Sequence, residues 1–189
     1  MAFKNINLTQ DKNNFFKGQQ SKGVVNITIF IGNLPDQLKD HQFERILRMC
    51  GPIRKWKRAY EKANFGFVDF GDAFIALRTI RVLSTLSKAS KYTNLVIKAD
   101  DKVRMGLRQL EKNNKLEAAR TGRRDDITQF LDKEAFRKAV TELANWSAQF
   151  TGIETKNEYD KILSLIKNEK IEIACHANND FTSDLLLES

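Results

Sequence analysis

The chain has 189 residues, enough for one ordinary domain and a second, smaller one. Apolar residues make up 41% of it, so a packed core is possible, but no segment approaches the roughly 18 apolar residues of a membrane helix. The N-terminus lacks the apolar run of a signal peptide, and 2 cysteines are too few for a disulfide framework. We therefore expect an intracellular protein that makes no contact with membranes.

The net charge of +8 is unevenly distributed. Residues 24–112 contain 17 Lys and Arg against 9 Asp and Glu, whereas residues 113–189 contain 11 against 14. A basic surface attracts polyanions and accelerates their encounter with the protein. The charge pattern therefore favours a nucleic-acid partner for the first two thirds of the chain, although charge alone does not define a binding site.

Predicted strands and helices alternate after a polar segment, residues 1–23, that indicates a flexible N-terminal arm. β-Branched and aromatic runs predict the strands, and apolar residues spaced by three and four predict the helices. In chain order these are a strand over 24–34, a helix over 40–50, strands over 53–60 and 65–70, a helix over 73–83 and a strand over 95–99. The order βαββαβ predicts an α+β fold in which two helices cover one face of a four-stranded antiparallel sheet and the other face stays open.

A third helix is predicted directly after the last strand. Asp100 can cap it, and Val103, Leu107 and Leu110 share one of its faces. With this helix, the first domain covers residues 24–112.

The rest of the chain has a helical pattern. Residues 113–124 are interpreted as a linker because they are charged and end in Thr-Gly-Arg-Arg. Residues 125–189 are expected to form a helical region whose apolar stripe packs locally, on the first domain or on a partner. Its predicted helices span 127–150, 155–166 and 180–187, and residues 171–175 fit either a strand or a further helical turn.

Alternation along two of the strands decides what the open sheet face presents. The isoleucines of residues 27–31 share one face, and burying each contributes about 1.5–3 kcal/mol. They are therefore expected to face the core, which turns Phe30 outward. In the later strand, Phe65 and Phe67 share the face opposite to Val68. If the two strands are neighbours, the three rings form one aromatic surface.

A sheet that is apolar on both faces must be covered on both. Unpaired bases stack on aromatic rings and contribute roughly 1–3 kcal/mol per base, so RNA is one candidate cover. Another protein element is the second candidate. Within this chain, the helix over 101–110 and Phe15-Phe16 of the arm are the segments that fit this role.

Two short segments resemble the signatures of a known family. Residues 29–34, Ile-Phe-Ile-Gly-Asn-Leu, resemble the first-strand signature of an RNA recognition motif, and residues 63–70 resemble its third-strand signature. All aromatic positions match, but Ala63 and Asn64 replace the usual basic residue and glycine, so the family's basic contact to the RNA backbone is missing there. The resemblance covers residues 24–112 and implies that the sheet binds single-stranded RNA.

The expected site combines base stacking with phosphate neutralisation. Its residues are Phe30, Phe65 and Phe67 for stacking, Lys57 and Lys98 for phosphates, and Asn33 in the first signature. Trp56 is expected in the core, because its spacing from Gly51 and Ile53 resembles the core pattern of the motif.

A narrower resemblance rests on four further segments. Cys50-Gly51, residues 56–58, residues 65–67 and residues 95–100 are similar to a splicing-factor family with an N-terminal RNA recognition motif and a C-terminal PWI domain. That family, with which the yeast Snu-type component groups, associates with the small nuclear ribonucleoprotein that selects the 5′ splice site. This resemblance implies a nuclear protein of pre-mRNA splicing whose partners are pre-mRNA or small nuclear RNA and spliceosomal proteins.

No pattern in the sequence indicates catalysis. His41 and Cys175-His176 lack partners at metal-ligand spacing, and there is no Gly-rich phosphate loop or nucleophile with a paired base. We therefore expect no enzyme activity, metal, cofactor or small-molecule substrate. The alternative to RNA binding is a protein-interaction module, in which the sheet face or the C-terminal helices hold a spliceosomal partner.

Overall fold

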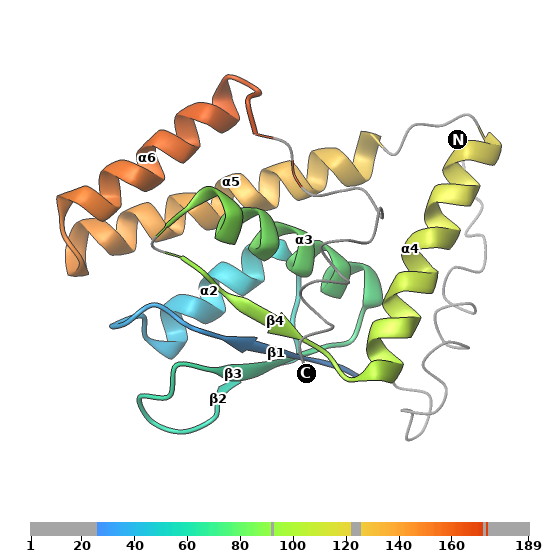
Figure 1. The fold of residues 1–189 in the computed structure, drawn as a ribbon, viewed down its shortest axis with the longest axis horizontal. Helices are drawn as coiled ribbons and strands as arrows, with labels where there is room; N and C mark the ends of the chain where they lie inside the picture. The colour runs from blue at the N-terminus through green and yellow to red at the C-terminus, as the bar shows by residue number, and fades with distance from the viewer. Residues whose placement is uncertain (1–25, 92, 122–125, 172, 174–189) are drawn as a thin grey trace.

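The computed structural model describes residues 26–91, 93–121, 126–171 and 173 (Figure 1). Its elements are β1 (Ile27–Gly32), α2 (Asp40–Cys50), β2 (Lys55–Arg58), β3 (Gly66–Phe70), α3 (Ala73–Ala89), β4 (Val96–Lys98), α4 (Asp101–Thr121), α5 (Asp126–Phe150) and α6 (Ile153–Lys167). The strands form one antiparallel sheet in the order β2-β3-β1-β4. The predicted α+β fold and the βαββαβ order are confirmed.

The core lies between one face of the sheet and helices α2 and α3. From the sheet it takes the inward residues of β1 and β3, which are Ile27, Ile29, Ile31, Val68 and Phe70. Trp56 of β2 is buried as expected and contacts the ring of Phe43 in α2 at a centroid distance of 4.8 Å. Gly66 makes room for it, because a Cβ atom there would lie 2.6 Å from the Trp56 ring.

The predicted linker is wrong over most of its length. Helix α4 continues without interruption from Asp101 to Thr121, so residues 113–121 are helical. The physical reason is composition, because Leu, Glu, Ala and Arg between residues 116 and 120 are all strong helix formers. The remaining linker positions 122–124, the N-terminal arm and the helix predicted over 180–187 lie outside the described residues.

Helix α5 packs on the outer side of α2 and α3 (Figure 1). Its buried apolar residues are Ala135, Phe136, Ala139, Val140, Leu143, Ala144 and Trp146. Leu131 of the same helix is 41% exposed, whereas its neighbour Asp132 is fully buried. The sequence left open whether the apolar stripe of this region packs locally or on the first domain. Helix α5 does both, because it contacts α6 as well as α2 and α3 of the first domain.

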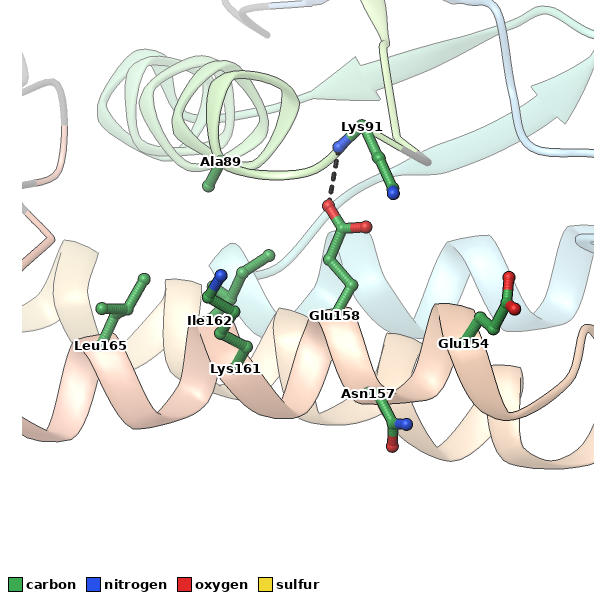
Figure 2. Close-up of a pocket in the computed structure, with 8 residues that line it drawn as sticks. All are labelled: Ala89, Lys91, Glu154, Asn157, Glu158, Lys161, Ile162 and Leu165. Carbon is green, nitrogen blue, oxygen red and sulfur yellow. Dashed lines mark hydrogen bonds between the residues drawn. The ribbon is translucent and has the colours of Figure 1, made fainter.

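Helix α6 returns along α5 and reaches the loop between α3 and β4. The carboxylate of Glu158 accepts a hydrogen bond of 2.8 Å from the backbone N–H of Lys91 (Figure 2). The Tyr159 hydroxyl forms a buried hydrogen bond with the hydroxyl of Thr93. A hollow lined by Ala89 and residues of α6 lies beside these contacts (Figure 2). The last helices are therefore attached to the βαββαβ unit at several points.

Cys50 lies at the end of α2 and is buried. Burial raises the pKa of its thiol from 9.0 to about 12, against smaller opposing effects of a hydrogen bond with Thr79 and the charge of Arg78. Burial also raises the pKa of Tyr159. Both groups therefore hold their protons more tightly in the folded protein than in the unfolded chain.

We expect the free energy of unfolding to fall as the pH rises above 9, because the unfolded chain loses the thiol proton before the folded protein does. The contribution is fully present below pH 9 and is lost toward pH 12. Urea unfolding at a series of alkaline pH values measures it. The Cys50→Ala variant should show a shallower pH dependence, with the Tyr159 contribution remaining; an unchanged dependence contradicts the assignment to the thiol.

Candidate nucleic-acid interface

Four side chains lie in one row across the open face of the sheet. In the strand register, Lys57 of β2 pairs with Phe67 of β3, Phe67 pairs with Phe30 of β1, and Phe30 pairs with Lys98 of β4. Residues directly opposite one another in a sheet project from the same face. The register therefore places the two phenylalanines between two lysines, and this set is named the aromatic row.

Phe65 joins the rings of the aromatic row from the position just before β3. The ring centroids of Phe30 and Phe65 are 5.5 Å apart, those of Phe30 and Phe67 5.7 Å, and those of Phe65 and Phe67 6.4 Å. Phe67 is 43% exposed, and Phe30 and Phe65 are half-buried. The three rings, named the phenylalanine triad, thus form the contiguous aromatic surface that strand alternation predicts.

Helix α4 does not cover the phenylalanine triad. Its apolar residues Val103, Leu107 and Leu110 are buried, and Glu111 lies 3.5 Å from the Nη1 atom of Arg81 in α3. The helix therefore packs toward the helical layer and rises away from the strands (Figure 1). The other candidate cover, Phe15-Phe16, lies outside the described residues.

Tyr60 is a fourth ring at this surface, and the sequence reasoning missed it. It is 65% exposed, and its ring meets Phe65 edge-on at a centroid distance of 5.9 Å. The sequence placed Tyr60 at the end of a strand over 53–60, but β2 ends at Arg58 and Tyr60 lies in the following turn. The available signal was an aromatic residue in an otherwise polar loop directly before the third-strand signature.

The lysines of this face are available to a ligand. Lys55 and Lys57 are exposed and Lys98 is half-buried, and none of the three has an ion pair or hydrogen bond with another residue that the structure describes. Arg58, in contrast, is engaged in the fold: it donates to the Oδ1 atom of Asp40 at 2.6 Å and to the carbonyls of Leu38 and Ala63. Lys57 and Lys98, which the sequence predicts as phosphate contacts, therefore remain candidates for that role.

Gly32 and Asn33 shape the end of β1. A Cβ atom on Gly32 would lie 2.8 Å from the ring of Phe30, so glycine leaves the space in which that ring lies. Asn33 has a positive φ of 57°, and its Nδ2 atom donates to the carbonyl of Asn94 at 2.7 Å. The Asn33 side chain thus ties β1 to the loop before β4, and the residue is exposed at the end of the strand.

Comparison with known families agrees with this geometry. Residues 29–88 match the family model of the RNA recognition motif, and this span includes both signatures and runs from β1 into α3. This segment is an RNA recognition motif. The resemblance stated from residues 29–34 and 63–70 is therefore confirmed, and β4 completes the four-stranded sheet of the motif just after the matched span.

The similar proteins are much longer than this chain. RNA-binding protein 25 of Mus musculus is 28% identical over 119 residues, which cover 59% of this chain and 14% of that protein. The human protein of the same name is 30% identical over 84 residues, 42% of this chain and 10% of that protein. The U1 snRNP-associated protein usp107 of Schizosaccharomyces pombe is 39% identical over 46 residues, 22% of this chain and 7% of that protein. No solved structure shows a significant match to this chain.

Two further properties concern the described residues alone. None of the helices that the structure describes is long and apolar enough to cross a membrane. Within the same residues, no group of three His, Cys, Asp or Glu side chains is placed to hold a metal ion.

Proposed function

We propose that this RNA recognition motif binds single-stranded RNA, with two or three bases stacked on the phenylalanine triad. The observation that supports this most directly is the aromatic row: exposed or half-buried rings in contact with one another lie between two lysines that have no partner among the described residues. Rings supply the sequence-tolerant stacking energy, and flanking ammonium groups neutralise the phosphates between stacked bases.

The positions of Lys57 and Lys98 support their role as phosphate contacts. Because Ala63 and Asn64 replace the basic residue and glycine of the family signature, the third strand offers no charge of its own at that point. Lys57 and Lys98 stand at opposite ends of the aromatic row, on the two edge strands of the sheet. A chain that crosses the sheet from edge to edge therefore meets a positive charge on each side of the rings. Asn33 contributes to the site through its loop contact with Asn94.

We place this RNA binding in nuclear pre-mRNA splicing, in contact with the ribonucleoprotein that selects the 5′ splice site. The support is the identity of two similar proteins, RNA-binding protein 25 and the U1 snRNP-associated protein usp107. The partners are then pre-mRNA or small nuclear RNA and spliceosomal proteins.

Salt dependence tests the proposal. The affinity of wild-type protein for a short single-stranded RNA should fall steeply with salt, and each phosphate contact contributes roughly 0.7 to the slope of log K against log salt. The Lys57→Ala, Lys98→Ala double variant should lower that slope by about 1.4. Fluorescence anisotropy at several salt concentrations gives the slopes.

The matched control replaces two exposed lysines of α6, Lys161 and Lys167, and should leave the slope unchanged. RNA affinity that does not respond to salt, or no measurable affinity, would contradict the proposal. Binding of a spliceosomal protein that is insensitive to salt would favour the protein-interaction alternative, because apolar contacts respond little to ionic strength.

A further inference from the structure

A second row of side chains lies beside the aromatic row on the same sheet face. Lys55 of β2 pairs in register with Asp69 of β3, and Asp69 pairs with Thr28 of β1. Each is two residues from a member of the aromatic row, so all three project from the same face as the rings. Thr28 and Lys55 are exposed and Asp69 is half-buried. These three residues are named the polar row.

The hydrogen-bonding capacity of the polar row follows from one contact. The Thr28 hydroxyl donates to the Oδ1 atom of Asp69 at 2.7 Å. With its proton committed, the hydroxyl offers only lone pairs, and an ionised carboxylate accepts but does not donate. Lys55 offers only donors. Across β2, β3 and β1 the row therefore presents a donor, an acceptor and an acceptor, in that order.

A carboxylate in the middle of this row disfavours a phosphate there and favours the edge of a base. Asp69 has no ion pair within the described part of the chain, although Lys55 lies directly across from it. The two rows are separated by two residues along each strand, which is about 6.6 Å at the usual rise of 3.3 Å per residue. A base stacked on Phe67 or Phe30 therefore extends its hydrogen-bonding edge over the polar row.

We propose that the polar row selects guanine at one stacked position. This inference rests on the proposed RNA binding and adds to it the identity of a base. The Watson–Crick edge of guanine presents an acceptor, O6, followed by two donors, N1–H and the N2 amino group. Lys55 donates to O6, Asp69 accepts from N1–H, and Thr28 accepts from the N2 amino group.

The other bases match the polar row less well. Uracil presents an acceptor, a donor and an acceptor, so its O2 atom faces the lone pairs of Thr28. Cytosine places its N3 acceptor against Asp69, and adenine offers the row one donor where guanine offers two. A mismatched base leaves a polar group without a partner, and a well-made pair of contacts discriminates against the wrong base by roughly five- to hundredfold.

The test uses short oligocytidylates whose central position is guanosine, inosine, uridine or cytidine. Wild-type protein should bind the guanosine oligomer about tenfold more tightly than the uridine one. Inosine keeps O6 and N1–H but lacks the N2 amino group, and it should bind with intermediate affinity. Asp69→Asn should remove most of the guanosine preference, and Thr28→Val should remove the difference between guanosine and inosine alone.

The control is Glu154→Gln, which changes the same charge on α6 and should preserve the preference. Circular dichroism and thermal melting establish that each variant is folded. Equal affinities of the wild-type protein for all four oligomers, or an unchanged preference in both folded polar-row variants, overturn this inference and leave the proposed RNA binding intact. Failure of the wild-type protein to bind any oligomer overturns both.

Discussion

Alanine at both Phe65 and Phe67 is expected to weaken the binding of single-stranded RNA by more than about thirtyfold. Each stacked base contributes roughly 1–3 kcal/mol, and this double variant removes two of the three rings of the phenylalanine triad. Phe30 alone then remains between the lysines of the aromatic row. Fluorescence anisotropy with a labelled RNA at one fixed salt concentration measures the loss.

The double variant should still fold. Phe67 is 43% exposed and Phe65 is half-buried, while the inward residues of the same strand, Val68 and Phe70, are fully buried and untouched. Phe130→Ala is the matched control, because that phenylalanine is 63% exposed on α5 and lies away from the sheet. A folded double variant that binds RNA as tightly as this control would exclude stacking on the triad.

The triad was predictable because strand alternation is a local rule. Three isoleucines fix the inward face of β1, so the position of Phe30 follows from counting by two. The aromatic row was not predictable in the same way. Its pairs, such as Lys57 with Phe67, depend on the register between strands, and a shift by one residue would place Lys57 on the opposite face.

The positions that sequence reasoning missed depend on contacts between distant segments. Asp132 was not expected in the interior, and the reason it is buried is Arg81, which lies 51 residues earlier in the chain. Tyr60 became part of the site because β2 ends two residues sooner than its sequence pattern indicates. Helix α4, in contrast, extends further than predicted. Its residues 113–121 were interpreted as part of a linker because they are charged, although their composition favours a helix.

Asp132→Ala is expected to lower the free energy of unfolding by about 3–5 kcal/mol. The Asp132 carboxylate has no exposed surface, and it accepts from the Nε atom of Arg81 at 2.7 Å and from the Nε atom of Arg78 at 3.2 Å. Both arginines belong to α3 of the RNA recognition motif, whereas Asp132 belongs to α5. Removing Asp132 leaves the buried guanidinium of Arg81 with Glu111, at 3.5 Å, as its remaining ion-pair partner among the residues that the structure describes.

The control for this prediction lies on the same helix. Glu142 of α5 also pairs with the motif, through Arg45 of α2 at 3.2 Å, but the Arg45 side chain is 65% exposed. Exposed pairs contribute less than about 1 kcal/mol, so Glu142→Ala should have a small effect. Urea unfolding of the two variants beside the wild-type protein separates a buried connection from an exposed one.

Urea unfolding of the wild-type protein and the Asp132→Ala variant also tests whether the motif and the C-terminal helices unfold together. Asp132 joins α5 to α3, and Glu111 joins α4 to the same Arg81, so one buried charge cluster connects three helices. If these helices form one cooperative unit, Asp132→Ala shifts a single transition that is seen equally by Trp56 in the motif and Trp146 in α5. Two separate transitions in the wild-type protein, or equal effects of Asp132→Ala and Glu142→Ala, would contradict this coupling. Because the cluster lies on the helical side of the sheet, a folded Asp132→Ala variant should keep its RNA affinity, whereas the triad variant should lose affinity and keep its stability.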